Sequence, residues 1–195
     1  MSKTLIIVIL DESGSMGNKK SDVLGGFNSF VSDQKQIKND HARLYMVKFN
    51  TTVSIVHKGI DLADVPELTA NNYLPGGMTA LYDAIAEGVR LADKDKKEDE
   101  RVICVIMTDG EENSSRETTK QQVKDIITGY QNRGDWTFIY IGENPDRWSR
   151  DAGMSGGNAT NYDHVDTRRN YMMANSAVSQ FRRSLSKQSS NLLSN

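Results

Sequence analysis

Three short apolar runs constrain the fold most, because each is apolar at consecutive positions rather than at alternate ones. They are residues 4–10 (TLIIVIL), 102–107 (VICVIM) and 136–141 (WTFIYI). A strand that is apolar on both sides must be buried on both faces, which is typical of the parallel strands of an α/β sheet. All three are far shorter than the ~18–20 apolar residues of a membrane-spanning helix, so we expect no membrane partner.

The segments between these runs carry apolar residues at every third or fourth position, which is the spacing of one face of an α-helix. Four such stripes begin at Val23, Leu81, Val123 and Tyr171. Strands that alternate with helices predict a parallel sheet with helices on both faces. We therefore expect an α/β fold with a doubly wound, mostly parallel central sheet.

One pair of strand-like segments departs from this alternation. Residues 42–49 and 52–57 are separated only by Asn50 and Thr51, and a connection this short can form only a hairpin. One of the two strands must then run antiparallel, at the edge of the sheet. Residues 58–78, which follow, contain two of the three prolines and the pair Gly76-Gly77. A loop this long inside a compact domain is usually functional.

Length and composition restrict the class of protein further. The 195 residues suit a single domain, which we place at residues 1–187, and we expect the Ser- and Asn-rich residues 188–195 to fray. The net charge of −2 gives no reason to expect nucleic acid as a partner. The single cysteine, Cys104, lies in an apolar run and indicates a reducing compartment, so we expect a cytoplasmic protein.

Oxygen-bearing side chains follow two of the predicted strands and the long loop. Asp11, Ser13 and Ser15 follow the first strand at alternate positions, Asp109 lies two positions beyond residue 107, and Thr79 lies where the loop turns into a helix. Ligands bind at the carboxyl edge of a parallel sheet, and the two aspartates meet there if their strands are neighbours. Carboxylate and hydroxyl oxygens suit a hard cation such as Mg²⁺ or Mn²⁺.

These residues, in this order, resemble the metal-ion-dependent adhesion site of the von Willebrand factor A domain family. The family pattern is D-x-S-x-S after the first strand, a Thr on a later loop and an Asp after the fourth strand, and it is matched by Asp11, Ser13, Ser15, Thr79 and Asp109. The stretches SGSM, GGFN, TALYDAI and TDGEENSSRE are similar to those of small stand-alone bacterial and phage members. The resemblance implies a Rossmann-like sheet and a bound Mg²⁺, with Mn²⁺ or another divalent cation as alternatives.

The resemblance also implies protein binding without catalysis, in which an Asp or Glu carboxylate of a partner protein completes the coordination of the metal. Ser13 and Ser15 would bind the metal directly, while Asp11, Thr79 and Asp109 would bind it directly or through water.

Two alternatives stay open. One is a metal-dependent hydrolase such as a phosphatase, which would need a general base or nucleophile that the pattern lacks. The other is a structural or assembly protein in which the metal only stabilises the loops. The pattern predicts neither the partner's identity nor an oligomeric state.

Charged residues outside the pattern have simpler interpretations. Glu12, Glu111 and Glu112 flank the predicted metal site, and we expect them to be solvated residues at its rim. The last helix carries several basic residues, Arg182 among them, and we expect these to form a solvated face.

Two further features of the sequence are interpreted as structural. Tyr73, Leu74 and Met78 of the long loop are expected to be buried within it, rather than exposed as anchors for a partner. Residues 153–157 (GMSGG) match the G-x-S-x-G pattern of a nucleophile elbow. That motif must follow a strand and open a helix, which is not predicted here, so we expect a turn.

Overall fold

The computed structural model describes residues 2–155, 157–184 and 186–194. In this part of the chain, strands form one six-stranded sheet in the order β3-β2-β1-β4-β5-β6. Every neighbouring pair is parallel except β2 and β3, which confirms a mostly parallel sheet with one antiparallel edge strand. The strands are β1 (Ser2–Asp11), β2 (Asp40–Phe49), β3 (Val53–Asp61), β4 (Glu100–Met107), β5 (Trp136–Gly142) and β6 (Ala159–Asn161).

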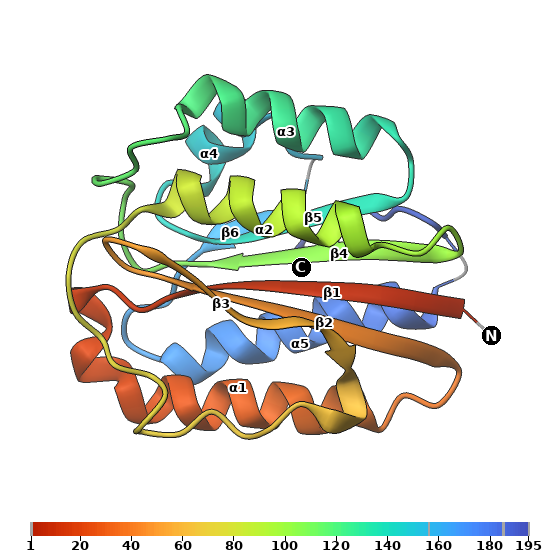
Figure 1. Cartoon of the computed structure of the whole chain (residues 1–195), viewed down its shortest axis with the longest axis horizontal. Coiled ribbons are helices and arrows are strands. Elements are labelled where there is room, and N and C mark those ends of the chain that lie inside the picture. The colour runs from red at the N-terminus through yellow and green to blue at the C-terminus, as the bar shows by residue number, and fades with distance from the viewer. Residues whose placement is uncertain (1, 156, 185, 195) are drawn as a thin grey trace.

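Helices cover both faces of the sheet (Figure 1). On one face lie α1 (Lys20–Lys35) and α5 (Thr167–Arg183), and on the other lie α2 (Leu81–Asp95), α3 (Lys120–Asn132) and α4 (Pro145–Ala152). Alternate residues of β1 are buried against opposite faces: Ile6 and Val8 belong to the core beneath α1 and α5, and Leu5 and Ile7 to the core beneath α2 and α3. Within the described residues, no helix is long and apolar enough to cross a membrane.

The strand order reverses at β1, so that later strands are added on its other side. The chain passes from β1 through α1 to β2 on one side, and returns later through α2 to β4 on the other side. Leu10 of β1 lies beside Met107 of β4, so the segments that follow these two strands leave the sheet next to each other. This arrangement creates the crevice at which open α/β sheets bind ligands.

The edge strand β3 is longer than the sequence predicts. It continues to Asp61, which still pairs with Arg43 of β2. A register shift in the β2–β3 ladder and a φ of 57° at Gly59 accompany this extension. The irregular connection therefore begins only after the short 3₁₀ helix η2 (Leu62–Asp64).

Residues 188–193 contact the rest of the fold, contrary to the expected fraying of residues 188–195, of which Asn195 lies outside the described residues. Leu192 is buried in the core beneath α5. The Gln188 amide donates to the backbone oxygen of Trp136 at 2.9 Å, and the Ser189 N–H donates to the Thr137 hydroxyl at 3.0 Å. The polar composition of this segment predicts fraying. Instead, Gln188 and Ser189 form hydrogen bonds with β5, and Leu192 is buried in the core.

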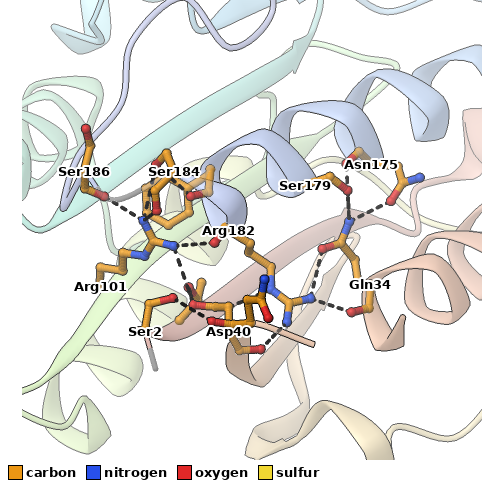
Figure 2. Close-up of polar contacts among 12 residues, drawn as sticks. Ser2, Gln34, Asp40, Arg101, Asn175, Ser179, Arg182, Ser184 and Ser186 are labelled. Atoms are coloured by element: carbon orange, nitrogen blue, oxygen red, sulfur yellow. Dashed lines mark hydrogen bonds and ion pairs between the residues drawn. The ribbon is translucent and has the colours of Figure 1, made fainter. Parts of the chain in front are cut away.

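A second correction concerns Arg182, which is buried rather than part of a solvated face (Figure 2). Its guanidinium binds the carboxylate of Asp40 at 2.8 Å and the side-chain oxygen of Gln34 at 3.1 Å. Arg101 of β4 approaches the same carboxylate at 3.5 Å and donates to the backbone oxygens of Arg182 and Ser184, near the end of α5. We call Asp40, Arg101 and Arg182 the buried arginine cluster. It joins α5 to β2 and β4 at the end of the sheet opposite the predicted site.

Candidate functional site

The predicted site lies where β1 and β4 end, at the left-hand edge of the sheet in Figure 1. Asp11 is the last residue of β1 and is fully buried. One of its carboxylate oxygens accepts from the Ser13 N–H at 2.7 Å, and the other accepts from the Thr108 hydroxyl at 2.6 Å. Burial raises the pKa of Asp11 and the nearby Asp109 raises it further, although the bonds from Thr108 and Ser13 oppose this. A cation would stabilise two carboxylates placed in this way.

The hydroxyls of the D-x-S-x-S segment link β1 to the residue after β4. The Ser13 and Ser15 oxygens lie 3.0 Å apart, and the Ser15 hydroxyl donates to one oxygen of Asp109 at 2.5 Å. The other oxygen of Asp109 is paired with the ammonium of Lys19. Lys19 ends the 3₁₀ helix η1 (Gly14–Lys19), which begins directly after Ser13 and connects β1 to α1.

The long loop brings Thr79 to the same place. The Gly14 N–H donates to the Gly77 oxygen at 3.1 Å, which ties the loop to the segment after β1. Gly77 has a φ of 77°, a conformation that favours glycine. The Thr79 N–H donates to the Asn113 side chain at 2.8 Å, and the Thr79 hydroxyl lies 3.9 Å from the position that a Cβ would take on Gly110. Thr79 is therefore adjacent to the residue that follows Asp109.

The chemistry of this donor set fits a hard divalent cation. Two carboxylates and three hydroxyls gather from three separate segments, and all of their ligand atoms would be oxygen. Within the described residues, the Thr79 hydroxyl forms no hydrogen bond, so its oxygen is available as a ligand. Across the same residues, no three side chains of His, Cys, Asp and Glu gather as a metal cluster. A cation held here would thus rely on hydroxyls as well as carboxylates.

The acidic residues beside the site are not all solvated, contrary to expectation. Glu12 is 8% exposed; it is paired with Lys48 at 2.7 Å and accepts from the Leu74 N–H at 2.6 Å. Glu112 accepts from the Tyr82 N–H at 2.9 Å, which fixes the loop after β4 to the start of α2. These two glutamates hold the loops in place. Glu12 is buried and Glu112 is partly buried, and both depend on contacts between distant segments, which spacing along the sequence does not reveal.

Glu111 is exposed, and the Asn144 side-chain amide donates to its carboxylate at 2.7 Å. The expectation of a solvated rim residue is therefore correct for this glutamate. Among the described residues, no Lys or Arg pairs with either Glu111 or Glu112.

The apolar residues of the loop divide into two groups. Tyr73 is fully buried, as expected, and its hydroxyl donates to the backbone oxygen of Asp11 at 2.7 Å. Leu74 and Met78 are 61% and 49% exposed, so the expectation of burial is wrong for these two. Lys19, Thr108 and Tyr73 all contact site residues but were not predicted to do so. The position of Thr108 between the strand and Asp109 is the one local signal that pointed to it.

The G-x-S-x-G segment does not form a nucleophile elbow. It follows helix α4 rather than a strand, and the next element is the strand β6; Gly156 lies outside the described residues. The Ser155 hydroxyl is 3.0 Å from the side-chain oxygen of Gln131, in α3. Ser155 therefore contacts α3 from the connection between α4 and β6, which agrees with the expectation that this segment is not a nucleophile elbow.

Comparison with known proteins places the chain in a family. The model of the von Willebrand factor type A domain matches residues 6–185, so the chain belongs to that family. No curated protein sequence matches it significantly.

Solved structures share the fold at low sequence identity. Manganese-loaded TRAP protein from Plasmodium vivax is 18% identical with a TM-score of 0.59, over 87% of this chain and 72% of TRAP. Proximal thread matrix protein 1 of the mussel byssus is 14% identical with a TM-score of 0.66, over 93% of this chain and 46% of the mussel protein. BatB from Bacteroides thetaiotaomicron is 13% identical with a TM-score of 0.57, over 93% of this chain and all of BatB. The chain thus spans less than half of the mussel protein.

Proposed function

We propose that this chain is a protein-binding module that acts through a divalent cation. Asp11, Ser13, Ser15, Thr79 and Asp109 would hold the cation, and an Asp or Glu carboxylate of a partner protein would bind to it. The observation that carries this proposal is the oxygen contact from Ser13 through Ser15 to Asp109, beside the buried carboxylate of Asp11. The family match supports it, because it covers the segments that contribute all five residues.

A partner carboxylate would be attracted by the ammonium of Lys19, which lies beside Asp109 and would leave the occupied site with a net positive charge. Asp11 and Asp109 together offset the two positive charges of a divalent cation, and the three hydroxyls are neutral ligands. Mg²⁺ and Mn²⁺ both accept such oxygens, and Mg²⁺ usually keeps several water molecules that another ligand can replace. Manganese is bound in the TRAP structure, and another structure of the mussel protein, 18% identical to this chain with a TM-score of 0.50, has zinc in its metal-ion-dependent adhesion site.

The residues around the proposed cation favour binding over catalysis. Hydrolysis needs a general base or nucleophile within hydrogen-bonding reach of the reacting group. Two of the histidines are engaged with carboxylates other than Asp11 and Asp109, His41 with Asp61 and His164 with Glu143. Tyr73, the buried hydroxyl beneath Asp11, is bonded to a backbone oxygen and has a strongly raised pKa because it is buried. We therefore propose a non-catalytic role. The expected cytoplasmic location stays a prediction.

Capture of partners from cell extract tests this function. Immobilised wild-type protein in Mg²⁺ buffer should retain a protein that EDTA elutes. Asp109→Asn, which keeps the side-chain shape but removes the charge, should retain none of it. Asp125→Asn is the matched control, because Asp125 is exposed on α3 and its carboxylate accepts from Gln121 of the same helix. Retention by Asp109→Asn equal to that of the control, or metal-dependent hydrolysis of phosphate esters by the wild type, would contradict the proposal.

A further inference from the structure

A pocket lies beside the proposed cation site, between the start of α2, the loop after β4 and helix α4. Its volume is about 220 Å³. Small-molecule sites typically measure ~300–1,000 Å³, so this pocket suits one long side chain better than a whole ligand. We call it the aromatic pocket, after the wall formed by Tyr82, Tyr140 and Trp148.

The aromatic wall is ordered by stacking. The rings of Tyr140 and Trp148 lie 4.7 Å apart at an angle of 19°, and those of Tyr82 and Trp148 lie 6.1 Å apart at 23°. Trp148 is partly exposed, whereas the second tryptophan of the chain, Trp136, is fully buried. Aromatic faces attract the cationic groups of Lys and Arg, and the attraction grows as water is excluded.

The rim of the pocket is acidic. Four carboxylates line it, from Glu111, Glu112, Glu143 and Asp151, against Lys120 and Arg147, so the lining Lys, Arg, Asp and Glu residues carry two net negative charges. Glu143 is also hydrogen-bonded to His164, which does not line the pocket. The two basic residues, Lys120 and Arg147, both pair with Asp151. The carboxylates also act on the aromatic wall: burial raises the pKa of Tyr140, and Glu143 and Glu111 raise it further. A basic side chain matches both the rim and the wall.

The pocket is close to the proposed cation along the chain. Tyr82 is three residues from Thr79, and Glu111 is two residues from Asp109. At ~3.3–3.6 Å per residue, the backbones of Tyr82 and Glu111 therefore lie within about 11 Å of those of two proposed ligands. The strained backbone of Asn144, with a φ of 48°, lies at the same rim, where its amide binds Glu111. Strain of this kind often accompanies a binding surface.

We propose that the aromatic pocket binds a basic side chain of the partner, two or three residues from the carboxylate that reaches the cation. Residues two apart in an extended peptide are separated by about 7 Å, which suits the short span between the two places. This inference rests on the proposed function. It adds that the partner segment carries an acid and a neighbouring base.

Short peptides test the proposal with the intact protein. The probes are Ac-Arg-Ala-Asp-Ala-Arg-amide and the same peptide with Gln in place of both Arg residues. A base on each side of the acid makes the test independent of chain direction. Binding is followed by the indole N–H resonance of Trp148 in ¹⁵N-labelled protein with Mg²⁺. The Arg peptide should move this resonance and bind about five- to thirty-fold more tightly than the Gln peptide.

Paired variants separate local recognition from general attraction by a negatively charged protein. Glu111→Gln keeps an oxygen to accept from Asn144 but lacks the charge, so it should remove most of the preference for Arg. Glu117→Gln is the control, because Glu117 is exposed on the same loop but does not line the pocket. Equal affinities for the two peptides, an unmoved Trp148 resonance, or an equal effect of the two variants would overturn the inference.

Repeating the titrations in EDTA distinguishes this inference from the proposed function. A preference for the Arg peptide that survives EDTA, with no effect of Mg²⁺ on affinity, would support the aromatic pocket and contradict the cation-mediated function. Binding that needs Mg²⁺ but shows no preference for Arg would do the reverse.

Discussion

Replacing Asp40 by Asn would remove the one carboxylate of the buried arginine cluster (Figure 2). The side chain of Asp40 is fully buried, and those of Arg182 and Arg101 are only 2% and 7% exposed. The pKa of Arg101 is already lowered by burial, and Asp40 is what opposes that effect. Asparagine would keep the shape and could still accept a hydrogen bond from Thr4. The change would therefore leave two buried guanidinium groups without a counter-charge.

The magnitude follows from burial. Breaking a buried ion pair by removing one partner typically costs about 3–5 kcal/mol, because the remaining charge is uncompensated. Domains of this kind have a total free energy of unfolding of about 5–15 kcal/mol. We therefore expect Asp40→Asn to lose roughly a fifth or more of the free energy of unfolding. In an Arg182→Met background, Asp40→Asn should lower the free energy of unfolding by less, because only the Arg101 guanidinium is then left without a counter-charge.

Urea unfolding followed by circular dichroism measures this loss, with the m-value as a check on two-state behaviour. Asp22→Asn is the matched control, because it breaks a surface ion pair with Arg168. The side chain of Asp22 is 38% exposed and that of Arg168 is 74% exposed. Exposed pairs contribute about 0–1 kcal/mol. A loss below about 1 kcal/mol for Asp40→Asn, at an unchanged m-value, would refute the reasoning.

Three further predictions concern single residues. Lys19→Met should tighten Mn²⁺ binding about tenfold or more by calorimetry, because charges of +1 and +2 about 5 Å apart repel by roughly 1.7 kcal/mol even in water; weaker binding would contradict this. Burial raises the pKa of Glu100, but hydrogen bonds from its ion-pair partner in β2 and from a backbone N–H outweigh burial and hold the pKa below its ordinary 4.5. The stability that Glu100 contributes is thus present above pH 4.5 and is lost as the pH falls through the folded-state pKa, so urea stability should fall less steeply below about pH 5 in Glu100→Gln than in the wild type. Gly26→Ala should destabilise the fold by about 1–3 kcal/mol in urea unfolding, because the new Cβ would lie 2.3 Å from the ring of Tyr171, whereas Gly25→Ala, which meets nothing within 4 Å, should be neutral or stabilising.

Features that depend on local spacing were predictable from the sequence. The apolar runs of β1, β4 and β5 identify the strands, and the two-residue gap after residue 49 identifies the hairpin. The order of Asp11, Thr79 and Asp109 along an alternating α/β chain predicts that their segments meet, and the structure brings those segments together. Binding of a cation by these residues stays a prediction.

Features that depend on contacts between distant segments were not predictable. Arg182 is 142 residues from Asp40, so its charge appears solvated when only its own helix is considered. Glu12 is buried because Lys48 and a backbone N–H of the long loop reach it. The strand β6 has three residues, too few to show a period. Residues 188–193 are held by hydrogen bonds to β5 and by Leu192 and Leu193, which their largely polar composition obscures.

Direct measurement of Mn²⁺ binding tests the central claim of a cation held by Asp11, Ser13, Ser15, Thr79 and Asp109. Titration of the purified protein, followed by calorimetry and by the loss of the free Mn²⁺ signal in electron paramagnetic resonance, should give one site per chain from which excess Mg²⁺ displaces the manganese. The site should be present in Asp125→Asn and absent in Asp109→Asn, with both variants folded by circular dichroism. One Mn²⁺ bound with wild-type affinity to folded Asp109→Asn, or none bound to the wild type, would contradict the claim.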